Sequence, residues 1–329
     1  MANQTRSGIS QLKGQTIGVI GGTGFIGRAV VEKLADAGAS VVILCRNADR
    51  AKRLKVLGDV GQVSVMSGDA LGDAALARLI AASDKIVNLV GILYPSGKQS
   101  FEAAQAQLPA RLAELSKGQD IQKIVHLSAI GADAASGSAY ARTKAAGEKA
   151  LREGAAASCA QAPTILRPSI VFGPGDGFFN RFGQMAMVAP ALPLIGGGTN
   201  KMQPVYVGDV AEAVLRVLSD KATDGEIYEL GGPTAYSFKE LMQLTLKAVD
   251  RRRALVPVPF AAMELPAALA GLLPTPPLTR DQLKLLKIDN VVSSEAKTLA
   301  DLGITPQPVE AHIFDYLAPF KPGGRFAQK

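Results

Sequence analysis

A glycine-rich turn near the N-terminus constrains the fold more than any other feature of the sequence. The apolar run TIGVIG at residues 16–21 passes directly into GGTGFIGRAVVEKL, which has the pattern of a turn followed by a helix. The glycines fit both G-x-G-x-x-G and G-x-x-G-x-x-G. Such glycines allow a tight turn and bring the backbone close to a pyrophosphate, which the amides at the helix N-terminus bind. In this strand–turn–helix context the motif predicts a dinucleotide site formed by Gly21, Gly22, Thr23, Gly24, Phe25, Ile26 and Gly27.

One pattern repeats through the first 170 residues: a short β-branched run and a turn precede a longer stretch rich in Ala and Leu. Most of the short runs are continuously apolar, which is typical of parallel strands covered on both faces. Strands alternating with helices predict a doubly wound, parallel α/β sheet of the Rossmann type. The expected strands are 16–21, 40–45, 62–66, 85–90, 123–128 and 163–168, with a later one in 226–232.

The repeating pattern breaks at residues 173–204, which are rich in Gly and Pro, and it ends at residue 232. From residue 233 onward we expect helices separated by prolines. The predicted organisation is a basic tail at 1–14, a dinucleotide-binding domain from 15–172 plus 205–232, and a smaller, mostly helical region from 173–204 plus 233–329.

Composition excludes several classes of function. The chain has two cysteines, Cys45 and Cys159, and two histidines, His126 and His312, so no His/Cys zinc cluster is expected. A net charge of +7 favours anionic ligands, but no nucleic-acid motif accompanies it, and we expect no nucleic-acid partner. No uninterrupted apolar run is long enough to span a membrane, and we expect no secretory signal.

The residue that ends the second expected strand indicates which dinucleotide is bound. An acidic residue there accepts from the ribose 2′-hydroxyl of NAD, whereas a cation meets the 2′-phosphate of NADP. Arg46 occupies this position, and Arg50 and Arg53 follow it, while Asp49 is expected to lie too far along the chain. We therefore predict NADP(H) rather than NAD(H). The alternative is that these arginines form a solvated, basic start of a helix.

Further contacts with the dinucleotide are expected at the ends of the next strands. Asp69 follows the third strand, where its carboxylate could meet the adenine amino group or could instead cap the next helix. Leu89, Val90 and Gly91 end the fourth strand and are predicted to line the middle of the cofactor.

Three residues could carry chemistry. Ser128 ends the fifth expected strand, and Tyr140 and Lys144 follow in a helical stretch, where a spacing of four residues places them on one face. A nearby ammonium would lower the pKa of the tyrosine and make it a usable acid or base, and a serine hydroxyl could hold a carbonyl oxygen.

With these residues in this order, the chain resembles the extended and atypical members of the short-chain dehydrogenase/reductase superfamily. The resemblance implies that Ser128, Tyr140 and Lys144 are active-site residues and that Lys144 also holds the nicotinamide ribose. The stretch LRPSIVFGPGD at 166–176 matches the segment that contacts the nicotinamide in the superfamily, which implies cofactor contacts from Pro168 and Ile170.

A closer resemblance covers roughly residues 14–310. The stretches YARTKAAGEKALRE, ILRPSIVFGPGDGFFNRF, TNKMQPVYVGDVAEAV and LTRDQLKLLKIDN are similar to the nucleotide-binding accessory subunit of respiratory complex I, of the alpha-subcomplex subunit nine type. That family implies a subunit of an NADH:ubiquinone oxidoreductase that holds NADPH for structure, outside the main electron path. It also implies other subunits of the hydrophilic arm and the membrane interface as partners, and a peripheral place on the cytoplasmic face of a bacterial inner membrane, or on the matrix side in mitochondria.

The segment from Leu255 to Leu278 favours such a place, because it carries one charge, Glu264, and follows three arginines. An apolar segment beside basic residues suits lipid headgroups or a membrane subunit, and otherwise it could form a lid or plain core. Two other functions remain open: a stand-alone NADP-dependent reductase or epimerase that uses Ser128, Tyr140 and Lys144, and a factor that visits complex I transiently. For the accessory subunit we expect no turnover of its own.

Overall fold

The computed structural model describes residues 12–97, 99–155, 162–271, 273 and 276–324, and the chain divides into two compact units. The first unit comprises Met1–Pro168, Gly208–Glu229 and Glu295–Ile304, and the second comprises Ser169–Val207, Leu230–Ser294 and Thr305–Lys329. The expected domains differ from this division by a few residues at most boundaries and by the segment 295–304. That segment joins the first unit because the backbone N–H of Glu229 donates to the carbonyl of Lys297, at 2.8 Å. Of the expected basic tail, residues 1–11 lie outside the described residues, as does Cys159.

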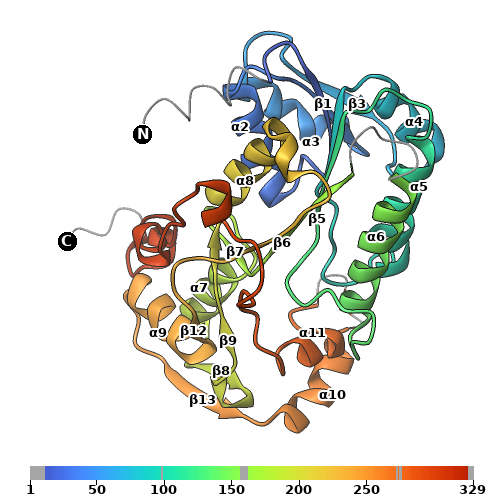
Figure 1. Ribbon diagram of the computed structural model, residues 1–329. Coiled ribbons are helices and arrows are strands. Elements are labelled where there is room, and N and C mark those ends of the chain that lie inside the picture. Colours follow the sequence, from blue (N-terminus) through green and yellow to red (C-terminus); the bar gives the residue numbers. More distant parts are fainter. Residues whose placement is uncertain (1–11, 98, 156–161, 272, 274–275, 325–329) are drawn as a thin grey trace. The chain divides into compact units, whose positions relative to one another are not determined.

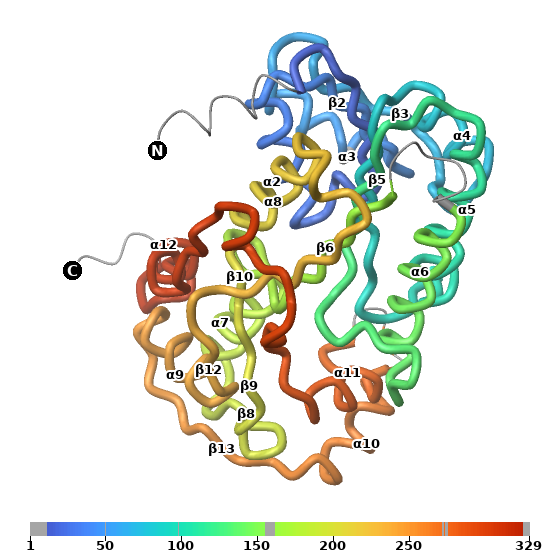
Figure 2. The backbone as a smooth tube through the Cα atoms, viewed as in Figure 1, coloured from blue at the N-terminus to red at the C-terminus, as the bar shows by residue number. Residues whose placement is uncertain are grey.

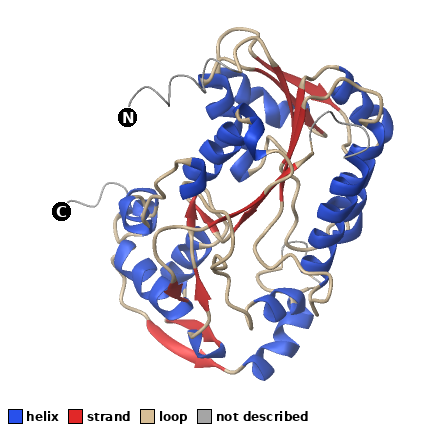
Figure 3. Ribbon diagram, in the orientation of Figure 1, coloured by secondary structure: helices blue, strands red, loops and turns tan. Residues whose placement is uncertain are grey.

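The first unit is built on a seven-stranded sheet with the order β11-β6-β5-β4-β1-β2-β3. Every neighbouring pair from β3 across to β6 is parallel, so the predicted doubly wound parallel sheet is confirmed. The strands are β1 (Thr16–Ile20), β2 (Ser40–Cys45), β3 (Val63–Ser67), β4 (Lys85–Asn88), β5 (Lys123–Leu127), β6 (Thr164–Pro168) and β11 (Ile227–Leu230). They appear as the long red arrows of Figure 3.

Helices cover both faces of this sheet. Figure 1 shows α4 (Asp73–Ala81), α5 (Leu108–Leu115) and α6 (Ala139–Ala155) along one face. On the other face lie α2 (Phe25–Asp36), α8 (Val207–Ser219) and the short α3 (Ala48–Lys52). An ion pair of 3.2 Å between Lys33 Nζ and Glu212 Oε2 joins α2 to α8. The carboxyl ends of the parallel strands β1, β2, β4 and β5 lie at the same end of the sheet. The predicted residues Gly21, Arg46, Leu89 and Ser128 follow these strands there.

Helix α2 follows β1 after four residues, and its two ends are formed by glycines. Gly24 is the N-cap and provides no side chain to satisfy the first amides of the helix. At the other end the chain turns at Gly38, whose φ of +82° suits a residue without a Cβ. The N–H of Ala39 donates to the carbonyl of Leu34 at 3.1 Å, which closes the helix.

The second unit contains short strand pairs and helices around an aromatic core. Its helices are α7 (Phe179–Val188), α9 (Phe238–Ala248), α10 (Phe260–Ala270), α11 (Arg280–Leu285) and α12 (Ile313–Tyr316). Its strand pairs are β7 (Val171–Phe172) with β10 (Val205–Tyr206), β9 (Lys201–Met202) with β12 (Tyr236–Ser237), and β8 (Ala191–Ile195) with β13 (Ala254–Val258). Buried members of the core include Phe172, Phe179 and Phe238.

Strand β13 replaces part of the helical region expected after residue 233. It pairs in parallel with β8, with Leu255 opposite Leu192 and Val258 opposite Ile195. Prolines are compatible with a strand at an edge, where a missing N–H breaks no central ladder, so Pro257 does not prevent the pairing. Figure 2 follows the backbone from β13 into α10.

Helix α10 carries much of the apolar segment from Leu255 to Leu278. Leu265 and Leu269, one turn apart on α10, are 66% and 61% exposed, so this face of the helix is not core. Within the described ranges, no helix combines the length and the apolar character needed to cross a membrane.

Candidate dinucleotide site

The turn between β1 and α2 has the geometry that a pyrophosphate requires. Gly21 has a φ of +85°, and the N–H of Gly24 donates to the Gly21 carbonyl at 3.0 Å. A Cβ on Gly27 would lie 2.3 Å from the carbonyl oxygen of Gly21 and 2.7 Å from the Cα of Gly22. A side chain there would collide with backbone, so the close approach of helix to strand depends on a glycine at this position.

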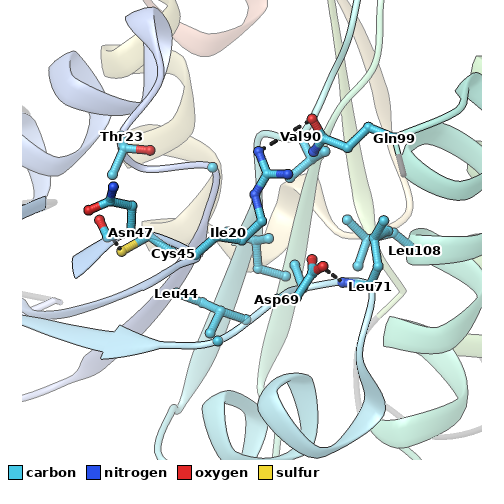
Figure 4. A pocket seen from close by; sticks show the side chains of 14 residues that line it. Ile20, Thr23, Leu44, Cys45, Asn47, Asp69, Leu71, Val90, Gln99 and Leu108 are labelled. Carbon is cyan, nitrogen blue, oxygen red and sulfur yellow. Dashed lines mark hydrogen bonds between the residues drawn. The ribbon is translucent and has the colours of Figure 1, made fainter. Parts of the chain in front are cut away.

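A cavity of about 160 Å³ opens beside this turn, within the first unit. Five of the predicted cofactor residues line it: Gly21, Thr23, Arg46, Asp69 and Val90. Phe25 and Ile26 form the first turn of α2 and are not among its lining residues. Figure 4 shows side chains from the ends of β1, β2 and β3 pointing into this space.

Arg46 directly follows β2, Asp69 lies two residues after β3, and both line the cavity. The Nη2 of Arg46 donates to the Oε1 of Gln99 at 3.3 Å. Arg53 is exposed and is not a lining residue, and the side chain of Arg50 lies outside what is described. Asp49 pairs with Lys52 on α3, at 2.7 Å. Of the arginines in this segment whose side chains are described, Arg46 lines the cavity and Arg53 does not.

The alternative role considered for Asp69, a cap on the next helix, is wrong. Helix α4 begins at Asp73, and its N-cap is Gly72, without a side-chain hydrogen bond. The Oδ1 of Asp69 instead accepts from the backbone N–H of Leu71 at 3.1 Å. This local turn fixes the carboxylate at the cavity wall.

The segment after β4 joins the glycine turn to Lys144. A Cβ on Gly21 would lie 3.2 Å from the carbonyl carbon of Leu89, so the turn packs on residues 89–90. A Cβ on Gly91 would lie 3.3 Å from the Nζ of Lys144. That Nζ donates to the carbonyl of Leu127 at 3.0 Å. Gly21, Leu89, Gly91 and Lys144 are thus consecutive parts of one continuous surface.

The three residues with candidate chemistry lie at the ends of β5 and α6. Ser128 is 4% exposed, and its Oγ has no hydrogen-bond partner among the described residues. The ring of Phe101 meets the ring of Tyr140 edge-on, at a centroid distance of 6.0 Å. Burial lowers the pKa of Lys144 to about 8, against a smaller opposing effect of Glu148.

The predicted effect of Lys144 on Tyr140 is wrong in this structure. Burial raises the pKa of Tyr140 to about 12, instead of an ammonium lowering it. Burial removes the phenol from water and so disfavours its ionised form, which is the cause of the raised pKa. As it stands, Tyr140 is a protonated hydrogen-bond donor near neutral pH.

A buried polar pair beneath the site was not predicted. The backbone N–H of Val90 donates to the Oδ1 of Asn88 at 3.1 Å, so the Nδ2 of Asn88 faces the Nδ1 of His126, 3.2 Å away. This arrangement makes Nδ1 the acceptor and places the imidazole proton on Nε2. Both side chains are fully buried. The sequence did contain a signal for this pair, because Asn88 is a polar residue inside the otherwise apolar stretch IVNLV.

Pro168 and Ile170, two further predicted cofactor residues, do not line the cavity. Pro168 ends β6 in the first unit, and Ile170 belongs to the second unit, where it packs against the aromatic core. Gln99 and Cys45 line the cavity without having been predicted. Gln99 follows a Gly/Pro/Ser-rich loop that has no recognisable motif, and Cys45 is the buried last residue of β2.

These features fit a dinucleotide. The glycine turn leaves helix amides uncapped beside a cavity, and the orphaned Oγ of Ser128 is a buried hydroxyl that lacks the partner a bound group could supply. Within the described part of the chain, no group of three or more His, Cys, Asp or Glu side chains could hold a metal ion.

The fold and this site define a nucleotide-binding member of the short-chain dehydrogenase/reductase class. The chain belongs to the NAD dependent epimerase/dehydratase family, whose sequence model matches residues 17–231. This membership supports a nicotinamide nucleotide as cofactor. A dTDP-glucose 4,6-dehydratase of Streptomyces venezuelae, solved with NAD bound, has the same fold: the TM-score is 0.70 at 20% identity, covering 92% of this chain and 95% of that chain.

Two curated relatives extend over almost the whole chain. It is 32% identical over 336 residues to "NADH dehydrogenase (ubiquinone) 1 alpha subcomplex subunit 9, mitochondrial" of Arabidopsis thaliana, covering 98% of this chain and 82% of that protein. It is 31% identical over 319 residues to "NADH-ubiquinone oxidoreductase 40 kDa subunit, mitochondrial" of Neurospora crassa, covering 97% and 83%. Within the larger family, the chain thus belongs with these subunit 9 proteins, as the sequence motifs predicted.

Proposed function

We propose that this chain is an accessory subunit of a respiratory NADH:ubiquinone oxidoreductase that holds NADP(H) outside the main electron path. The observation that carries the proposal is the extent of the likeness to the subunit 9 proteins. It covers 97–98% of this chain and includes the second unit, in which a different enzyme would have its own substrate-binding elements. The role is structural: the bound nucleotide stabilises the first unit.

The choice of NADP(H) rests on Arg46. Its guanidinium lies at the end of β2, where a 2′-phosphate would be met, and it lines the cavity. Asp49, the first carboxylate after β2, pairs with Lys52 rather than with a group in the cavity. A guanidinium at this place favours a phosphate, and a free ribose hydroxyl would lack its carboxylate acceptor.

The proposed partners are the neighbouring subunits of the hydrophilic arm and of the membrane interface, with the chain bound peripherally to the cytoplasmic face of a bacterial inner membrane, or to the matrix side in mitochondria. The exposed leucines of α10 support a buried contact in the assembled complex, because an apolar helix face is costly to leave in water. Lipid headgroups are a further contact of this kind.

The second candidate is a stand-alone NADP-dependent reductase or epimerase. It is favoured by the buried, unpartnered Oγ of Ser128 and by the lowered pKa of Lys144, because a site kept for chemistry needs both a donor for a carbonyl oxygen and a proton source. This function requires reduction of a small carbonyl compound by NADPH, and loss of that activity in Tyr140→Phe.

A native gel of gently solubilised membranes that carry a tagged copy distinguishes the two functions. Co-migration of the tag with the band that stains for NADH dehydrogenase activity supports the accessory subunit. Migration of the tag as a small species that oxidises NADPH with carbonyl substrates would contradict the accessory subunit and favour the reductase.

A matched pair of variants tests the contact. Leu265→Asp with Leu269→Asp should release the tag from the large band, whereas Val60→Asp, at a still more exposed apolar position in the first unit, should not. Retention of both variants in the large band would remove α10 from the proposed contact.

A further inference from the structure

A side chain from outside the motif reaches Arg46 across the cavity. Figure 4 shows Gln99 and Asp69 among the side chains that line the cavity. The Oε1 of Gln99 accepts from the Nη2 of Arg46 at 3.3 Å, and both residues line the cavity. Gln99 is 53 positions away in sequence and belongs to the segment after β4.

Gln99 is held from both sides. The backbones of Ser96 and Gln99 exchange two hydrogen bonds, of 2.9 and 3.0 Å, which close a tight turn on its N-terminal side. The π-helix η2 (Glu102–Gln107) begins on its C-terminal side. The backbone of Gln99 is therefore held by pairing with Ser96, and from this fixed backbone its side chain reaches Arg46.

Gln105 in η2 anchors this segment to the rest of the site. Its Nε2 donates to the carbonyl of Ile92 at 2.8 Å, and its Oε1 accepts from the Oγ1 of Thr143 at 2.8 Å. Gln105 is fully buried, and a Cβ on Gly147 of α6 would lie 1.9 Å from its carbonyl oxygen. Residues 92–97 and 99–105 thus form a strap whose C-terminal end Gln105 fixes against α6.

An arginine at the end of a strand is otherwise a flexible, exposed side chain. Fixing it for a phosphate loses rotamer freedom, and a partner that already holds it reduces that loss. A neutral amide is suited to holding the guanidinium. It accepts a hydrogen bond from one N–H and leaves the positive charge and the remaining donors for a phosphate. A carboxylate in its place would neutralise the guanidinium and compete with the phosphate.

We propose that Gln99 is a specificity-determining positioning residue, which holds the Arg46 guanidinium in place for the 2′-phosphate of NADP(H). The inference rests on the proposed choice of NADP(H) and adds a second residue to it. Gln99 itself supplies no charge to the nucleotide. Through Gln99, the preference for NADP(H) over NAD(H) depends on the position of the strap.

The experiment uses the full chain freed of nucleotide, with calorimetric titration by 2′,5′-ADP and by 5′-AMP, which differ in the 2′-phosphate. Loss of one hydrogen bond in Gln99→Leu should weaken 2′,5′-ADP about three- to tenfold and leave 5′-AMP within about twofold. Gln99→Glu should weaken 2′,5′-ADP more than Gln99→Leu does. In Arg46→Ala, adding Gln99→Leu should have no further effect. Gln119→Leu, the same change at an exposed position outside the cavity, should match the unmodified chain.

The outcomes separate this inference from the proposed cofactor. Equal affinity of the unmodified chain for both probes would overturn the choice of NADP(H) and the inference with it. A preference for 2′,5′-ADP that Arg46→Ala removes and Gln99→Leu leaves intact would overturn the role of Gln99 alone. Equal weakening of both probes by Gln99→Leu would make Gln99 a merely structural residue and would also overturn the inference.

Discussion

Arg167 on β6 holds Glu148 on α6 with two parallel hydrogen bonds. The Nη2 of Arg167 lies 2.6 Å from Oε2, and its Nε lies 2.9 Å from Oε1. The side chains are 23% and 6% exposed, and Glu229 lies 3.7 Å from the same guanidinium. Because Glu148 follows Lys144 by one helical turn, this pair fixes the part of α6 that presents Lys144 to the site.

Removal of Arg167 should therefore destabilise the first unit. Arg167→Met leaves the Glu148 carboxylate buried without its partner, and we expect the free energy of unfolding to fall by about 2–4 kcal/mol. Chemical denaturation at neutral pH measures the change. Lys149→Met, which breaks an exposed pair with Glu153 on the same helix, should cost less than about 1 kcal/mol. Equal costs for the two variants would mean that the buried pair contributes no more than a surface pair.

Replacement of Gly27 and replacement of Gly24 should affect stability and NADPH affinity differently. Gly27→Ala places a Cβ against the backbone of Gly21 and Gly22, and we expect a loss of about 1–3 kcal/mol in stability and of about tenfold or more in NADPH affinity. In Gly24→Ala the Cβ would lie 3.3 Å from the carbonyl oxygen of Gly21, a contact that a small shift relieves, so the loss of stability should be smaller than in Gly27→Ala while the approach of the pyrophosphate suffers. Thermal unfolding and NADPH fluorescence titration measure both quantities. Unchanged stability of Gly27→Ala would contradict the packing argument.

Much of the first unit could be predicted because its strands are continuously apolar and its first turn uses glycines for backbone reasons. The expected strand at 40–45 is found at Ser40–Cys45. Strand β13 could not be predicted in the same way. Its prolines indicate a break in local structure, and only its partner β8 makes an edge strand of it.

The candidate site was predictable where backbone geometry or strand order carries the signal, as for Arg46 and Asp69 at the ends of β2 and β3. It was not predictable where a long-range contact decides, as for Gln99, which meets Arg46 from a loop without a motif. The error for Tyr140 has a different cause. Helical spacing gives its distance from Lys144 but not the burial that sets both pKa values.

Stability should rise with pH through the titration of Lys144. Its pKa is about 8 in the folded chain and about 10.4 when unfolded, so between these values the unfolded chain binds more protons. The cost of burying the ammonium is present below pH 8 and is relieved as the pH rises. Relative to Lys144→Met, the unmodified chain should gain about 2 kcal/mol between pH 8 and pH 10. Denaturation at both pH values measures this difference, and the exposed Lys149→Met should show no such trend.

Acid should destabilise the chain through His126. Burial, with a smaller effect of Lys144, lowers the pKa of His126 to about 3, against about 6.5 when unfolded. Between these values the unfolded chain binds the extra proton, so stability is lost as the pH falls. His126→Asn keeps an acceptor for the Nδ2 of Asn88 but cannot titrate, so the unmodified chain should lose about 2 kcal/mol more than this variant between pH 6.5 and pH 4.5. Parallel acid unfolding curves for the two proteins would mean that His126 takes up its second proton, on Nδ1, in the folded state, which would require the Asn88 amide to turn its oxygen toward that nitrogen.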